Sequence, residues 1–186
     1  MSYLDDSVAQ LRIFEGVIPW MYLDTRGLVT VGVGEMLAAV AAAQALPFID
    51  GSGNPVAPDI IVAEYNRVAG LPMGQAAGTY RANASPILAD ASIDNLLMGR
   101  VRDFDQQLSA KFANYAAFPD PARLGLLDMI YNLGPRGLFV GYPTFMGCVN
   151  NENWTGAAGE CYRNGPSPAR NDWTRQQFLA AAAGNP

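Results

Sequence analysis

The feature that most constrains the fold of this chain is a long apolar stripe in its second half. Residues 92–112 repeat apolar side chains at the spacing of one helix face, with Ser92 as the expected cap and Asp94 in the first turn. The stripe consists of Ile93, Leu96, Leu97, Val101, Phe104 and Leu108. A helix of this length can connect two lobes, so we expect two lobes joined by one long helix.

The signals for β-strands are confined to a region near the N-terminus. Residues 6–16 predict a short helix that ends at Gly16, and residues 20–24 and 28–34 predict a β-hairpin around the sequence DTRG. Residues 70–86 are rich in Gly, Ala and Pro, and a hairpin and an irregular loop remain equally open for them. Further helices are expected at 35–46, 59–69, 119–134, 143–149, 152–163 and 167–184. The predicted fold class is therefore α+β and mostly α, with a small N-terminal β-hairpin lobe joined by the long helix to a C-terminal helical lobe.

Length and composition favour a single domain. The 186 residues are 50% hydrophobic and 16% charged, which is typical of a globular protein. We expect one domain over residues 1–186, with an N-terminal lobe at about 14–91 and a C-terminal lobe at about 92–186 plus the first helix. The longest apolar run, 36–49, is too short to span a bilayer and is interrupted by Pro47, so we expect no membrane insertion.

The charged residues narrow the possible partners and chemistry. The net charge is −5, and the 12 Lys and Arg residues are scattered, which argues against nucleic acid as a partner. The chain contains no histidine, so Ser-His-Asp and Cys-His nucleophile systems are excluded, and the commonest zinc ligand is missing. We therefore expect no metal and no cofactor, and we expect carboxylates to perform any acid–base catalysis.

The two cysteines do not form a recognisable motif. Cys148 and Cys161 are too few for a disulfide-rich scaffold and too widely spaced for a zinc knuckle. They lie in two predicted helices that can pack against each other. A disulfide and two buried thiols both remain open.

Two carboxylates and a threonine lie close together in the N-terminal region. Glu15 falls in the last turn of the first predicted helix, Asp24 opens the hairpin turn, and Thr30 lies in the second strand on the same side as Gly32. Glycoside hydrolysis uses two carboxyl groups, one to protonate the leaving oxygen and one to support the attacking water. Residue types alone fit such a pair, but they also fit an ordinary helix end and an ordinary turn.

The spacing of these residues resembles the active-site segment of the phage-type (T4 lysozyme-like) lysozymes, glycoside hydrolase family 24. That family has a helix that ends in Glu-Gly, then Y-x-D-x-x-G, then T-x-G-x-G. The corresponding residues here are Glu15, Gly16, Tyr22, Asp24, Gly27, Thr30, Gly32 and Gly34. Residues 126–139, 143–163 and 168–179 resemble later segments of the family, and residues 38–90 match least well. One departure is Glu35, which stands where the family often has a histidine.

The resemblance implies a muramidase, which cleaves the β-1,4 bond between N-acetylmuramic acid and N-acetylglucosamine in peptidoglycan. It implies that Glu15 is the general acid and that Asp24 and Thr30 position the water. Tyr22 and Gly32 are expected either to contact the substrate or to support the catalytic residues. The family generally inverts the anomeric centre, which implies carboxyl groups roughly 6.5–9.5 Å apart. Arg170 matches an arginine on the family's last helix that reaches the catalytic glutamate.

Two other polar residues have open roles. Asp128 lies on the inside of an apolar helix, and it is either a partner that supports the acid or a hydrogen-bonded core aspartate. Asn132 either contacts a sugar amide or supports the end of its helix.

Alternatives to a muramidase also remain. The chain can be a lysozyme-like module that binds glycan or a partner without cleaving it, or a glycosidase directed at chitin or chitosan. The N-terminus lacks a basic region followed by an apolar one, so we expect no signal peptide. We expect synthesis in the cytoplasm and action on the bacterial cell wall, in the periplasm, either as a phage endolysin or as an injected toxin. In the second case the partners include delivery machinery and a dedicated inhibitory or immunity protein.

Overall fold

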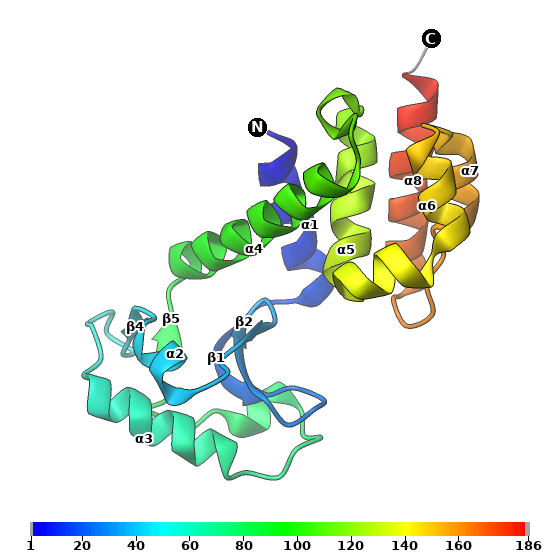
Figure 1. Ribbon diagram of the computed structural model, residues 1–186. Coiled ribbons are helices and arrows are strands. Elements are labelled where there is room, and N and C mark those ends of the chain that lie inside the picture. Colours follow the sequence, from blue (N-terminus) through cyan, green and yellow to red (C-terminus); the bar gives the residue numbers. More distant parts are fainter. Residues whose placement is uncertain (1, 185–186) are drawn as a thin grey trace. The chain divides into compact units, whose positions relative to one another are not determined.

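A computed structural model describes residues 2–184, and within them the chain forms eight α-helices and one five-stranded antiparallel sheet (Figure 1). The predicted α+β class with a helical majority is confirmed. The chain divides into two compact units. The sheet unit comprises Glu15–Leu97, and the helical unit comprises Met1–Phe14 with Met98–Pro186.

The sheet unit contains all five strands. Their order across the sheet is β3-β2-β1-β5-β4, and each neighbouring pair is antiparallel. The strands are β1 (Ile18–Leu23), β2 (Val29–Gly32), β3 (Glu35–Met36), β4 (Phe48–Ile49) and β5 (Ile87–Leu88). The helices of this unit are α2 (Val40–Gln44), α3 (Pro58–Ala69) and a 3₁₀ helix at Ala77–Tyr80. The predicted hairpin is confirmed as β1 and β2, and the predicted helix 59–69 is confirmed as α3.

The predicted helix at 35–46 is wrong in its first part. Gly34 has a φ of +78°, which reverses the chain directly after β2. Glu35 and Met36 then pair with β2 as a short strand, and the Leu37 N–H donates to the Val29 carbonyl at 2.8 Å. Within the predicted range only Val40–Gln44 is helical. The reversal at Gly34 places Glu35 and Met36 beside β2, where they form strand pairs and cannot start a helix.

The residues from 70 to 86, which were open between a hairpin and a loop, form an irregular loop that contains the short 3₁₀ helix. The Tyr80 side chain is buried at 1% exposure and anchors this loop. Its hydroxyl donates to the Pro72 carbonyl at 3.0 Å and accepts from the Gln75 N–H at 3.3 Å.

The predicted long helix is α4 (Asp90–Lys111), and its first residues belong to the sheet unit while the rest belong to the helical unit. The helix begins before the expected cap, because the Ser92 N–H donates to the Ala89 carbonyl at 2.9 Å, so Ser92 lies inside the helix. Four residues of the apolar stripe are buried: Ile93, Leu97, Val101 and Leu108.

The helical unit gathers the remaining helices around a core of large apolar side chains. They are α1 (Tyr3–Glu15, of which Glu15 falls in the sheet unit), α5 (Asp120–Gly141), α6 (Pro143–Asn150), α7 (Trp154–Glu160) and α8 (Pro168–Ala183). The core includes Leu11, Leu126, Phe145, Trp154 and Phe178. Helices α5 and α8 approach closely at Gly125, where a Cβ atom would lie 2.7 Å from the Phe178 ring.

The sequence predicts Asp120 as the cap and Gly134 as the end of the helix at 119–134, and Ser167 as the cap of the last helix. The predictions for Gly134 and Ser167 are confirmed, and the cap at Asp120 is wrong. Gly134 has φ +69° and ψ 166°, so the first part of α5 ends there and Pro135 opens a second part. The Ser167 side chain accepts from the Arg170 N–H at 3.2 Å and caps α8 as expected. Asp120, however, is the first residue of α5, and Pro119 holds the cap position without a side-chain hydrogen bond.

Candidate active site

The sheet unit holds the three residues that the sequence predicts as catalytic. Glu15 is the last residue of α1, and its side chain is exposed. Gly16 follows with a φ of +75°, so the chain leaves the helix at once and enters β1. The helix end therefore presents the Glu15 carboxyl at the start of the strand that leads to the hairpin turn.

The hairpin turn fixes the Asp24 carboxylate. Oδ1 accepts from the backbone N–H groups of Arg26 at 2.9 Å and Leu28 at 2.8 Å. Oδ2 accepts from the Arg26 guanidinium, with Nε and Nη2 both at 3.2 Å. The turn is closed by the Gly27 N–H, which donates to the Asp24 carbonyl at 3.0 Å. The carboxylate is thus held in one orientation by its own turn, and Oδ2 faces a charged partner on one side.

These contacts also set the protonation of Asp24. Burial acts to raise its pKa, but the hydrogen bonds from the Leu28 and Arg26 backbone and from the Arg26 side chain outweigh burial and hold the pKa below its usual value. Asp24 is therefore ionised at neutral pH. Arg26 is the residue of this site that the sequence reasoning missed, although its position two residues after Asp24 in a type I turn is a signal for such a pair.

Thr30 is buried at 2% exposure in the middle of β2. Its hydroxyl donates to the Leu28 carbonyl at 2.9 Å, which occupies its single hydrogen. The oxygen keeps lone pairs, so Thr30 can accept a hydrogen bond but cannot donate a second one. Its backbone lies opposite Tyr22 on β1.

Tyr22 lies close enough to both carboxyl groups for their charges to act on its hydroxyl. Its pKa is raised by burial first, and then by the negative charges of Asp24 and Glu15. Both carboxylates therefore act on the Tyr22 hydroxyl within this one unit. Gly32, by contrast, lies against a side chain of α4, because a Cβ atom added there would be 3.4 Å from Ile93. Glycines on one face of a strand predict a close approach by another backbone or a ligand, and the neighbour at Gly32 is instead the Ile93 side chain.

The helical unit holds the other sequence-predicted residues. Asp128 is buried at 2% exposure, and its carboxylate lies between two arginines. Oδ1 accepts from Arg170 Nε and pairs with Nη2, both at 2.8 Å. Oδ2 accepts from Arg163 Nη2 at 2.6 Å and from the Thr174 hydroxyl at 2.5 Å. Asp128 is thus a hydrogen-bonded core aspartate, as one of its two expected roles requires.

Arg163, which the sequence analysis does not single out, is fully buried in this cluster at 0% exposure. Its side chain also donates to the Asp128 carbonyl at 3.1 Å and to Asn171 Oδ1 at 3.3 Å. No local pattern in the sequence indicates this burial, since Arg163 lies in an irregular stretch between α7 and α8. The guanidinium of Arg170 also lies 5.1 Å from the centre of the Phe14 ring. That Arg170 supports Glu15 stays a prediction.

Asn132 lies two residues before the break at Gly134, and its side chain is exposed.

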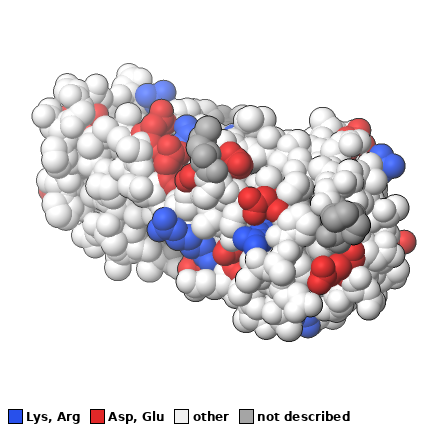
Figure 2. All heavy atoms as spheres, turned by 90° about the horizontal axis from the view of Figure 1, so that it is seen from above, with Lys and Arg blue, Asp and Glu red and all other residues white. Residues whose placement is uncertain are grey.

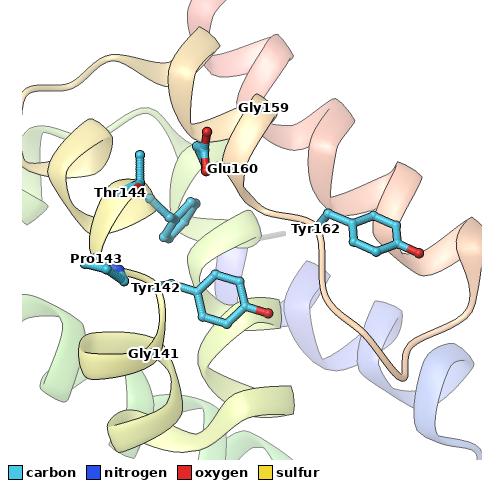
Figure 3. Close-up of a pocket in the computed structure, with 8 residues that line it drawn as sticks. Gly141, Tyr142, Pro143, Thr144, Gly159, Glu160 and Tyr162 are labelled. Carbon is cyan, nitrogen blue, oxygen red and sulfur yellow. The ribbon is translucent and has the colours of Figure 1, made fainter.

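A hollow of about 270 Å³ lies in the helical unit, where α5 and α7 end and α6 begins (Figure 3). The side chains of Tyr142, Glu160 and Tyr162 line it, and none of the sequence-predicted site residues does.

The thiols of Cys148 and Cys161 are both free, so they form no disulfide, and of the two expected buried thiols only Cys161 is buried while Cys148 is partly exposed. Burial raises the pKa of the Cys161 thiol.

Among residues 2–184, no group of His, Cys, Asp and Glu side chains is arranged to hold a metal ion. None of the helices formed by these residues is both long and apolar enough to cross a membrane. On the face displayed in Figure 2, acidic and basic side chains lie among each other within a largely uncharged surface.

Comparisons with known proteins identify the fold. No family model matches the chain, and no curated protein matches it at a significant level. Among solved structures 42 chains match. One of them, a crystal structure of a mutant of P22 lysozyme, is 19% identical to this chain, and the alignment covers 96% of this chain and 99% of that one with a TM-score of 0.59. The chain therefore has a lysozyme-like α+β fold.

Proposed function

We propose that this protein is a peptidoglycan hydrolase of the muramidase type, which cleaves the β-1,4 bond between N-acetylmuramic acid and N-acetylglucosamine. The observation that carries the proposal is the arrangement within the sheet unit. There, a helix end, a turn and a strand present Glu15, Asp24 and Thr30, and both carboxylates act on Tyr22. The lysozyme-like fold is consistent with it.

In the proposed reaction Glu15 is the general acid. Its exposed carboxyl group donates a proton to the glycosidic oxygen as the bond from that oxygen to the anomeric carbon breaks. The sugar becomes positively charged in the transition state. The ionised Asp24 carboxylate, which its turn holds in place, stabilises that charge without having to reorient.

Asp24 and Thr30 hold the attacking water. Asp24 Oδ2 and the Thr30 hydroxyl oxygen both have lone pairs that accept from a water molecule, and neither can donate to it. A water bound through its two hydrogens presents its own lone pair to the anomeric carbon. As the new C–O bond forms, the water gives up a proton, which Asp24 accepts and passes to solvent. Arg26 keeps Asp24 a weak base, so orientation and charge are the larger part of its proposed role.

The proposed macromolecular partner is the glycan strand of peptidoglycan, and the proposed place of action is the bacterial cell wall. The negative charge gives no long-range attraction to an anionic wall, which favours local delivery, either by release from a phage-infected cell or by injection. An injected enzyme requires an inhibitory protein in the cell that makes it. Co-purification from a producing strain tests for that protein.

The test of the proposed function is the release of reducing ends from purified peptidoglycan by the wild type, Glu15→Gln and Asp59→Asn. Asp59 is an exposed carboxylate of the same unit at the start of α3, so its variant controls for the loss of one charge. We expect the wild type and Asp59→Asn to cleave and Glu15→Gln to lose at least about 100-fold in rate. Glu15→Gln cleaving at the wild-type rate refutes the role of Glu15. Cleavage of chitin oligomers but not of peptidoglycan identifies a chitin-directed enzyme, and binding without cleavage identifies a glycan-binding module.

A further inference from the structure

A large apolar side chain lies exposed against the turn that carries Asp24. Met73 is 63% exposed, in the loop that follows α3. It contacts the last residue of the turn, because a Cβ atom added at Gly27 would lie 3.3 Å from the Met73 sulfur and 3.7 Å from its Cβ. Met73 thus combines an exposed apolar side chain with a position next to the turn that carries Asp24.

The loop that carries Met73 is held in place by buried groups. The buried Tyr80 hydroxyl bonds to Pro72 on one side of Met73 and to Gln75 on the other. A loop that is hydrogen-bonded on both sides of one residue presents that residue in a defined position.

A second set of contacts ties the far end of the loop to the sheet. The Trp20 indole N–H of β1 donates to the Ala77 carbonyl at 2.9 Å, and the Arg81 guanidinium lies 4.6 Å from the centre of the Trp20 ring. Arg67 of α3 donates to the Tyr80 carbonyl at 2.5 Å and pairs with Glu64. The loop is thus joined to the same strand that leads into the Asp24 turn.

We propose that Met73 is a substrate-contacting residue, whose thioether packs against the apolar face of a sugar ring or its acetamido methyl group when a glycan strand lies along the Asp24 turn. The inference rests on the proposed function for the identity of the ligand. The exposed position of Met73, its contact with Gly27 and the anchoring by Tyr80 support it. A flexible, polarisable side chain suits the mixed apolar and polar surface of a sugar.

The first experiment measures glycan binding directly at Met73. The chain has seven methionines, so selective ¹³C labelling of the methionine methyl groups gives few signals, and Met73→Leu assigns the one of interest. Soluble glycan fragments of peptidoglycan are titrated into the full-length Glu15→Gln variant. We expect the Met73 methyl signal to shift and saturate, while Met129, fully buried in the helical unit, does not move.

The second experiment separates binding from chemistry. We expect Met73→Ala to raise KM for glycan by roughly fivefold with kcat nearly unchanged, and Met73→Leu, which keeps the apolar volume, to restore KM. Tyr80→Phe removes the anchor, and we expect it to raise KM in the same direction. The matched control is Ile60→Ala, because Ile60 is also exposed in the sheet unit, at 50%, on α3.

The two experiments distinguish this inference from the proposed function. If the wild type does not cleave peptidoglycan but the Met73 signal shifts on titration, the proposed function fails and the contact stands. If cleavage occurs and Met73→Ala changes neither KM nor any glycan-induced shift, the inference is overturned and the proposed function stands. A loss of kcat with unchanged KM also overturns it, because Met73 then only supports the turn. An unshifted Met73 signal at saturating glycan overturns it in every case.

Discussion

At the level of single residues, the Asp24 carboxylate is held by groups of its own turn. The Arg26 side chain is 69% exposed, and its guanidinium contacts only Oδ2, so this ion pair adds little to stability but changes the charge environment of the carboxylate. The backbone bonds from Arg26 and Leu28 would keep the orientation of Asp24 without the guanidinium.

We therefore expect Arg26→Gln to act through protonation. Removing the guanidinium takes away one of the groups that lower the Asp24 pKa, so that pKa rises, and the acid limb of the pH–activity profile moves to higher pH. Activity is lost first at low pH and is nearly retained at neutral pH. A profile of kcat/KM over about pH 4 to 7 measures the shift, with Arg175→Gln, an exposed arginine on α8, as the control. An unmoved acid limb contradicts the role of Arg26.

A second residue-scale feature is the buried charge cluster of Asp128, Arg163 and Arg170. One carboxylate pairs with two buried guanidinium groups, and Thr174 completes its hydrogen bonds. Buried charges are tolerated only when they are paired, so the cluster is stable as a whole and costly to open at one point.

We expect Asp128→Asn to lower the free energy of unfolding by about 3–5 kcal/mol, because it removes the carboxylate that pairs with Arg163 and Arg170 in the core. Asp120→Asn is the matched control. Asp120 is 66% exposed and lies 3.8 Å from Arg123, so its loss costs less than about 1 kcal/mol. Urea unfolding of both variants measures the difference, and equal losses would show that the buried cluster contributes little.

At the level of elements, α5 is divided by one glycine. Gly134 combines a positive φ with an extended ψ, a region that side chains rarely adopt. No neighbouring atom lies within 4 Å of a Cβ added there, so any cost of a substitution comes from the backbone alone.

We expect Gly134→Ala to destabilise the protein by about 1–3 kcal/mol through backbone strain. Gly99→Ala in α4 serves as the opposite case. Gly99 lies inside the helix with open space where a Cβ would go. Alanine has the higher helix propensity, so we expect the substitution to raise the free energy of unfolding by about 0.5–1 kcal/mol. Thermal unfolding of both variants gives the signs, and a neutral Gly134→Ala would mean that the two parts of α5 can rearrange at no cost.

The junction of α3 with the loop depends on Glu64, which accepts from Arg67 and from the Ser85 hydroxyl. Burial acts to raise the Glu64 pKa, but the bonds from Arg67 and Ser85 outweigh burial and lower it. A folded-state pKa below the unfolded value contributes stability that is fully present above about pH 4.3 and is lost as the pH falls through the folded pKa.

We therefore expect Glu64→Gln to be less stable than the wild type at neutral pH, by about 1–3 kcal/mol, and to lose less further stability on acidification from about pH 5 to about pH 3. The free energy of unfolding in urea across that range measures both effects, with Asp59→Asn as the control. A variant whose acid dependence equals that of the wild type shows that Glu64 does not titrate with folding.

Elements with local signals could be predicted from the sequence. The cap at Ser167, the stop at Gly134 and the DTRG turn depend on residues close in the chain, and the structure confirms them. The strand at Glu35–Met36 was missed because its alanine-rich continuation favours a helix, and only the reversal at Gly34 and pairing with β2 decide otherwise. Arg163 and Met73 could not be found, because their partners lie far away in sequence.

At the level of the whole molecule, the fold is lysozyme-like. The proposed muramidase reaction depends on residues of the sheet unit alone. The sheet unit carries Glu15, Asp24 and Thr30, and the helical unit carries the buried cluster around Asp128. A fold alone does not determine a reaction, so the chemistry must be read from the products.

The most direct measurement is mass spectrometry of borohydride-reduced fragments after digestion of purified peptidoglycan. We predict that the wild type creates new ends with reduced muramic acid and that Glu15→Gln creates none. Reduced glucosamine at the new ends, or the same fragments from Glu15→Gln as from the wild type, would contradict a muramidase that uses Glu15 as its acid.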